Sequence, residues 1–158
     1  MVDDGEMTDQ DCGAAPRWVR PALVVLAVPS LIAGLWGLVA PEHWFDTFPG
    51  WAPRLVAAIP PYNEHLATDG AAGLFASGFV AAVAALWMQR EIVIVSMTAY
   101  LAFALPHAVF HLANPADALT TSEDAVNIIS LTIAVVLALA VMIESIRRES
   151  PDATGAPS

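Results

Sequence analysis

Four runs of apolar residues, each long enough to cross a bilayer, most constrain what this chain can fold into. A helix rises about 1.5 Å per residue, so about twenty apolar residues span the ~30 Å hydrocarbon core of a membrane. Composition agrees, because 57% of the 158 residues are hydrophobic and only 14% are charged. The sequence therefore predicts an all-α, four-helix integral membrane bundle. The predicted helices occupy residues 22–40, 64–88, 92–112 and 124–143.

The first run also has an interpretation as a secretory signal peptide, because arginines precede it and Leu38-Val39-Ala40 ends it. A signal peptide usually has an apolar region of about 7–15 residues, which this run exceeds, and Pro41 suits a cleavage site poorly. We therefore interpret the run as a spanning helix. Its small residues, which predict close contact with a neighbouring helix, are Ser30, Gly34 and Gly37.

The net charge of -10 describes the start of the chain more than any binding surface. Five of the sixteen acidic residues lie in the first eleven positions. We predict that residues 1–20 form an acidic disordered tail with a basic flank, and that residues 147–158 form a second disordered tail. With six Arg and no Lys, the chain lacks a basic surface for nucleic acid. Cys12 is the only cysteine, which excludes an intrachain disulfide and any CxxC motif.

Residues 41–61 form the longest connection, and five prolines prevent this segment from being a spanning helix. Its concentration of aromatic side chains predicts that it lies in the membrane interface. Two arrangements satisfy that expectation: a lid over the end of the bundle, or membership of the aromatic belt, which we favour. The aromatic residues are Trp44, Phe45, Phe48 and Trp51.

Local signals define the other helix ends. Asn63 is a good N-cap, and Glu64 in the first turn suits the positive end of the helix dipole. Residues 89–91 form a three-residue turn, which is short enough to make the flanking helices antiparallel neighbours. The segment 120–124 holds two overlapping capping patterns, so the last helix begins there.

The distribution of arginine predicts the orientation in the membrane. Five of the six Arg lie in the two terminal flanks and in the turn at residues 89–91, whereas Arg54 alone lies in a loop on the other side. The positive-inside rule then places both termini in the cytoplasm. The predicted location is the bacterial cytoplasmic membrane.

Two histidines four residues apart, His107 and His111, lie inside the third apolar run. An ionisable side chain in a membrane span usually faces a protein interior or a wet cavity, so it indicates a functional site. Pro106 removes a backbone donor and should bend the helix beside His107. At 100° per residue, one face of this helix carries the small and polar residues Ser96, Tyr100, Ala104, His107 and His111.

The predicted up-and-down topology brings the polar ends of three helices to the outer face of the membrane. We therefore expect one cluster, with Asp69, His107 and Asp124 close together. The candidate metal ligands are His65, Asp69, His107, His111 and Asp124, and the candidate ligand-binding residues are Asn63, Glu64, Tyr100 and Asn127.

Three interpretations of this cluster remain open. Two imidazoles at i and i+4 with nearby carboxylates suit a divalent transition metal, and haem is a related possibility. The cluster also suits a small polar ligand or a lipid headgroup. Alternatively, the two histidines hydrogen-bond Asp69, Asp124 or Asn127 across helices and only hold the bundle together.

No sequence motif identifies a reaction. The chain contains no G-x-S-x-G, H-E-x-x-H or P-loop. The leading hypothesis is a membrane protein that binds a metal ion or small polar ligand at the cluster. The alternatives are a non-catalytic accessory or assembly protein, with a membrane-protein partner or a second copy, and a metal-dependent membrane hydrolase or redox enzyme.

Two blocks also carry a family resemblance. Pro61-Tyr62-Asn63-Glu64-His65, followed by Asp69-Gly70, and Pro106-His107-x-x-Phe110-His111 resemble an uncharacterised family of small bacterial four-helix membrane proteins, similar in outline to the DoxX-like group. The resemblance covers roughly residues 21–143. It implies the fold and the membrane location, and no activity, cofactor or substrate.

Overall fold

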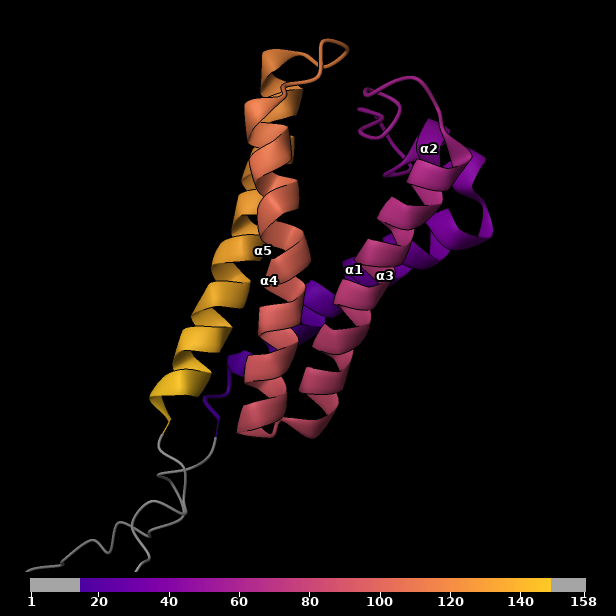
Figure 1. The fold of residues 1–158 in the computed structure, drawn as a ribbon. Helices are drawn as coiled ribbons and strands as arrows, with labels where there is room; N and C mark the ends of the chain where they lie inside the picture. The colour runs from indigo at the N-terminus through magenta and orange to yellow at the C-terminus, as the bar shows by residue number, and fades with distance from the viewer. Residues whose placement is uncertain (1–14, 149–158) are drawn as a thin grey trace, which may run out of the picture.

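The structure is a computed structural model that describes residues 15–148, and within that range every regular element is a helix (Figure 1). Four of the five helices are long and apolar enough to cross a membrane. The predicted all-α architecture is therefore confirmed, and the protein is a multi-pass membrane protein. Both predicted tails lie largely outside the described residues. The helices are α1 (Val19–Val39), α2 (Pro41–Thr47), α3 (Glu64–Trp87), α4 (Arg90–Ala113) and α5 (Thr121–Arg147).

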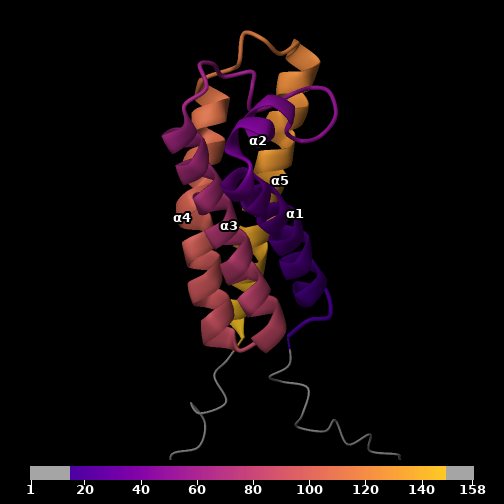
Figure 2. The same ribbon diagram turned by 90° about the vertical axis from the view of Figure 1, so that its right-hand side faces the viewer.

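The spanning helices form two pairs, α1 with α3 and α4 with α5, and α3 joins the pairs by packing on α4. In contrast, α3 and α5 do not pack against each other, and α1 touches α5 only lightly. Both ends of the described chain lie at one end of the bundle, which we call the terminal end (Figures 1 and 2). At the opposite end, which we call the α2 end, the two pairs diverge (Figure 1).

Glycines allow α1 and α3 to approach closely. A side chain at Gly34 would collide with the backbone of Phe75 on α3, and one at Gly78 would meet the backbone of Leu31 on α1 at 2.6 Å. Gly37 similarly faces Ala71. These contacts confirm that the small residues of the first span face a neighbouring helix, as is common where lipid supplies no hydrophobic drive for helix association.

The connection after α1 contains one element that the sequence analysis did not anticipate. Residues 41–47 form the short helix α2, with Pro41 in its first turn, where a missing amide donor costs nothing. Trp44 on α2 is 5% exposed and packs against Gly37 of α1. The prediction that this connection does not span the membrane stands, but its first third is helical.

The predicted caps of the other helices are confirmed. The Leu66 amide donates to Asn63 Oδ1 at 3.1 Å. Thr120 and Glu123 form a reciprocal capping box, in which the Thr120 amide donates to Glu123 Oε2 at 2.8 Å. The turn between α3 and α4 is shorter than predicted, because α4 already begins at Arg90. Met88 adopts a left-handed conformation (φ 53°) that reverses the chain there.

Several spans extend beyond their predicted apolar limits. The first begins at Val19 rather than at residue 22, and the last ends at Arg147 rather than near residue 143. Polar residues such as Ser145 and Arg147 therefore belong to helix, because a helix need not end where its apolar run ends. Residue type marks the hydrocarbon core, whereas backbone hydrogen bonding sets the helix length.

The largest buried side chains lie toward the terminal end. Val19 and Leu23 of α1 meet Val93 and Met97 of α4, with Val141 of α5, in one cluster. All five side chains are fully buried. All four spans contribute to this cluster, which holds the two helix pairs together where they are closest.

Candidate functional site

The face of α4 that carries both histidines is turned inward. Ser96 and Tyr100 are buried, and His107 and His111 are half-buried. By contrast, Val109 is 54% exposed, as expected for a lipid-facing side chain. The predicted polar face of this helix is therefore the face that packs against the protein.

An aromatic stack fixes the position of His107. Its ring lies parallel to Phe103, with centroids 5.4 Å apart, and Phe103 fills the space left by Gly73 on α3. His111 meets His107 edge-on, with ring centroids 4.8 Å apart. Gly73 on α3 thus makes room for the stack that places both imidazoles.

Residues of α5 complete the surroundings of the histidines. Asp124 lies near enough to His111 for their charges to interact. Asn127 is one turn deeper than Asp124 along α5, and His107 is one turn deeper than His111 along the antiparallel α4. Asn127 therefore lies at the level of His107. It is only 9% exposed.

His65 and Asp69, the two candidate metal ligands on α3, do not join this group. His65 pairs with Asp69 of its own helix, Nε2 to Oδ2 at 3.5 Å, and both side chains are well exposed. Within residues 15–148, no three His, Cys, Asp or Glu side chains converge as metal ligands. The structure therefore does not assemble the expected five-residue metal cluster of His65, Asp69, His107, His111 and Asp124. Helix α5, which carries Asp124, does not pack on α3, and the helix pairs diverge at this end.

The interhelical hydrogen bonds expected of structural histidines are also not found. In the described part of the chain, neither His107 nor His111 bonds Asp69, Asp124 or Asn127, and their neighbours are aromatic rings. The side-chain amide of Asn127 likewise bonds no protein group there. The backbone carbonyl of Asn127 accepts a hydrogen bond from the Ser130 hydroxyl at 2.7 Å. Neither amide atom of Asn127 is among the fully enclosed unpartnered atoms, so the amide keeps some accessible surface.

The segment between α2 and α3 reaches the loop between α4 and α5. Together the two segments line an open pocket of about 260 Å³ at the α2 end of the bundle. Arg54 contributes from one side, and Glu123 from the start of α5 contributes from the other. The lid and the aromatic-belt arrangements both stay predictions. The remaining lining residues are Pro53, Ala57, Ala58, Ala118 and Leu119.

Aromatic contacts hold α2 and Phe48, the residue that follows it, against the end of α1. Trp36 Nε1 donates to His43 Nδ1 at 3.0 Å, and the Trp36 ring also lies beside Phe48. Sequence reasoning did not assign a role to His43, whose partner is seven residues earlier in the chain. The available signal was Trp36 in the last turn of the span, followed by His43 shortly after Pro41.

The remaining candidate residues lie apart from the histidine pair. Asn63 and Glu64 are exposed at the start of α3, where Asn63 acts as a cap. Tyr100 is deeper, 5% exposed, and lies close to Ser30 of α1.

Tyr62, which directly precedes Asn63, lies among carboxylates. Desolvation raises the pKa of the Tyr62 hydroxyl, and three carboxylates raise it further. These carboxylates belong to Glu64, Glu42 and Asp46.

No family model, curated protein or solved structure matches this chain. The resemblance to DoxX-like proteins thus gains no family match, and what stands of it is a small membrane protein with four candidate spans.

Proposed function

We propose that the protein is a membrane-embedded binding protein whose site for a small polar ligand lies between α4 and α5, toward the α2 end. The observation that carries this proposal is Asn127, which is 91% buried inside an apolar span without a hydrogen bond to its amide within residues 15–148. Because the Asn127 amide keeps some accessible surface, its cost is below the about 1–3 kcal/mol of a fully buried amide without a partner. Polar groups that persist at such a cost are typical of binding sites.

The neighbouring side chains define the chemistry of the ligand. A neutral imidazole offers one donor and one acceptor, and the Asn127 amide offers both as well. Asp124 adds an acceptor near His111. This set suits an uncharged or cationic molecule with hydroxyl, amino or amide groups, because an anion would be repelled by the Asp124 carboxylate.

A divalent transition metal is the second candidate, and the close approach of the two imidazoles favours it. Their ring centroids are 4.8 Å apart on one helix face, and imidazole nitrogen is a preferred ligand for Zn²⁺ and similar ions. Because no third His, Cys, Asp or Glu side chain of residues 15–148 joins the two imidazoles, a bound ion would take its other ligands from water or substrate. Such a site would keep coordination positions open for water or substrate.

A pair of substitutions tests the proposal. Asn127→Leu removes the unpartnered amide, so we expect the variant to melt at a higher temperature than the wild type, with the bound ligand lost. Native mass spectrometry of detergent-purified protein measures the bound mass. His65→Ala is the matched control, because His65 is exposed on α3 and should leave both measurements unchanged.

The accessory-protein alternative makes the opposite prediction. If Asn127 and the histidines only hold helices together, Asn127→Leu should lower the melting temperature, and the wild type should carry no additional mass. Metal analysis with and without a strong chelator separates the two binding candidates. Near-stoichiometric metal that disappears in His107→Ala and His111→Ala would assign the site to a metal ion.

We further propose that the terminal end faces the cytoplasm. Five of the six arginines lie near that end, and only Arg54 lies at the α2 end. In a Cys12→Ser background, cysteines introduced at Thr47 and Ala118 should react with an impermeant thiol reagent in intact cells, whereas one at Gln89 should not. The reverse labelling pattern would invert the orientation.

A further inference from the structure

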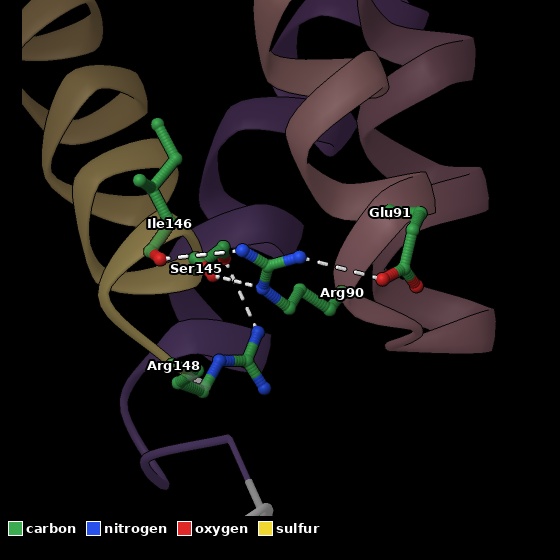
Figure 3. Close-up of polar contacts among 5 residues, drawn as sticks. All are labelled: Arg90, Glu91, Ser145, Ile146 and Arg148. Atoms are coloured by element: carbon green, nitrogen blue, oxygen red, sulfur yellow. Dashed lines mark hydrogen bonds and ion pairs between the residues drawn. The ribbon is translucent and has the colours of Figure 1, made fainter. Parts of the chain in front are cut away.

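Arg54 differs from two arginines at the terminal end, whose guanidinium groups are already bonded to α5. There, Arg90 donates from Nε to the Ser145 carbonyl at 3.0 Å, and Arg148 donates from Nη2 to Ser145 Oγ at 3.2 Å (Figure 3). Arg54, in the connection between α2 and α3, is exposed and makes no hydrogen bond or ion pair within residues 15–148. Its positive charge is therefore available to a ligand.

The pocket at the α2 end has charges of opposite sign in its two walls. Its volume is about 260 Å³, with Arg54 in the wall that the α2–α3 connection forms and Glu123 in the wall formed by the α4–α5 loop and the start of α5. The two side chains form no ion pair with each other, so both charges remain open to a third group. The other lining residues are apolar, namely Pro53, Ala57, Ala58, Ala118 and Leu119.

Backbone hydrogen bonds hold both walls in shape. The Ala58 amide donates to the Arg54 carbonyl at 3.2 Å, and Ala58 itself is buried. In the other wall, the Leu119 amide donates to the Ala116 carbonyl at 3.0 Å. The pocket is therefore formed before a ligand enters, which lowers the cost of ordering the protein on binding.

The capping box of α5 fixes the position of the Glu123 carboxylate. The Thr120 amide and hydroxyl both donate to Glu123 Oε2, at 2.8 and 2.7 Å. In the part of the chain that the structure describes, Glu123 Oε1 accepts no hydrogen bond. A carboxylate oxygen of this kind accepts hydrogen bonds from an ammonium group. Glu123 thus serves the helix start with one oxygen and keeps the other for a ligand.

We propose that this pocket binds a zwitterion, with an anionic phosphate or carboxylate group at Arg54 and a primary ammonium group at Glu123. A guanidinium group binds such anions with directional hydrogen bonds. Pockets for drug-sized molecules have volumes of about 300–1,000 Å³. A pocket of about 260 Å³ therefore suits a smaller molecule, of the size of phosphoethanolamine, whose methylene groups would contact the alanine side chains.

Two sources supply this chemistry, a lipid headgroup and a soluble zwitterion. The pocket lies where the spans α3 and α5 begin, which is the level of lipid headgroups. Phosphatidylethanolamine carries a phosphate and a primary ammonium group. Phosphatidylglycerol lacks the ammonium group, and the quaternary ammonium of phosphatidylcholine has no N–H to donate to Glu123. These three lipids therefore separate the two charge contacts.

Lipid competition tests the pocket in the full-length protein. Detergent-purified protein is offered the three lipids with identical acyl chains, and bound lipid is counted by native mass spectrometry. We expect a preference for phosphatidylethanolamine, and its affinity should fall about five-fold in Arg54→Gln and in Glu123→Gln, because each variant removes one exposed ion pair. Glutamine at position 123 keeps the capping box, since glutamine also serves at this helix position.

Two controls separate the pocket from net charge and from the site proposed between α4 and α5. Asp117→Asn removes a charge from the same loop but outside the pocket, so it should keep the affinity. Asn127→Leu, which should empty the α4–α5 site, should also leave phosphatidylethanolamine binding unchanged. Circular dichroism checks that each variant is folded. An unchanged affinity in Arg54→Gln or in Glu123→Gln, or an equal loss in either control, would overturn the proposal.

Soluble phosphoethanolamine identifies the source of the zwitterion. If it displaces the lipid, and its own binding weakens in Arg54→Gln and Glu123→Gln, the pocket binds a zwitterion that need not carry acyl chains. If it displaces no lipid while both variants lose phosphatidylethanolamine, the ligand is the lipid itself. Displacement by inorganic phosphate or by ethanolamine alone, at the same concentration, would show that one charge suffices and would overturn the zwitterion site.

Discussion

Polar side chains at the two ends of the bundle differ in whether protein groups satisfy their hydrogen bonds. At the terminal end, Arg90 and Ser145 bond the carbonyls of α5, so these groups hold the structure together. Toward the α2 end, His107 and Asn127 lie inside the protein without a protein hydrogen bond in the described range. We interpret the bonded Arg90 and Ser145 as structural, and the unpartnered Asn127 amide as part of the proposed ligand site.

Packing follows the same division. The fully buried residues Val19, Met97 and Val141 join the two helix pairs near the terminal end. Toward the α2 end the pairs diverge (Figure 1). Phe103 of α4 lies against Gly73 of α3. The end with the larger core should therefore determine stability, while the other end is free to serve binding.

The largest effect on stability is expected when two glycines of the bundle are each replaced by alanine and compared. Gly34→Ala places a methyl group against the backbone of Phe75, so we expect a loss of about 3 kcal/mol in the free energy of unfolding. Gly70→Ala meets nothing within 4 Å and should gain up to about 1 kcal/mol from helix propensity. Unfolding in a denaturing detergent series measures both. Equal effects would mean that α1 and α3 have room to separate.

The second effect concerns the terminal end alone. Arg90→Gln removes the charged donors to the Ser145 and Ile146 carbonyls, and we expect a loss of about 1–2 kcal/mol after allowing for partial exposure. Arg54→Gln is the control, because Arg54 is exposed and bonds no group within residues 15–148. A comparable loss in both variants would show that net charge, rather than the carbonyl bonds, sets stability.

A smaller effect tests whether the α2 end also contains structural polar groups. Thr120→Ala breaks the capping box at the start of α5 and should cost about 1 kcal/mol. Thr121→Ala is the matched control, because the capping box uses Thr120 and Glu123. Thermal melts followed by circular dichroism measure the difference. Identical melting temperatures for the two variants would contradict the assigned cap.

The smallest stability effect should come from the histidine pair. His107→Phe preserves the ring stacked on Phe103 and removes only polar atoms that bond no described protein group, so we expect a change below about 0.5 kcal/mol. Bound ligand, measured as for Asn127→Leu, should nevertheless be lost. A marked drop in melting temperature would show that the His107 nitrogens support the fold.

Prediction from sequence succeeded where a local pattern has one structural solution. Asn63 and Thr120 became caps because their side chains bond amides three residues away, and the inward face of α4 followed from helical periodicity. It failed for α2, because five prolines and several aromatics in this connection conceal a short helix of seven residues. For Asp69 the structure shows an ion pair with His65 of its own helix, and its expected approach to His107 stays a prediction.

The sequence by itself determined four spans, their inward polar face and the concentration of arginine at one end, because hydropathy, periodicity and charge are local properties. Only the tertiary structure decided which polar groups meet. The absence of packing between α3 and α5 keeps Asn127 apart from α3, whereas α4, which carries both histidines, packs on α3 through Phe103 and Gly73. Depth in a membrane fixes one coordinate of a side chain, and helix packing fixes the other two.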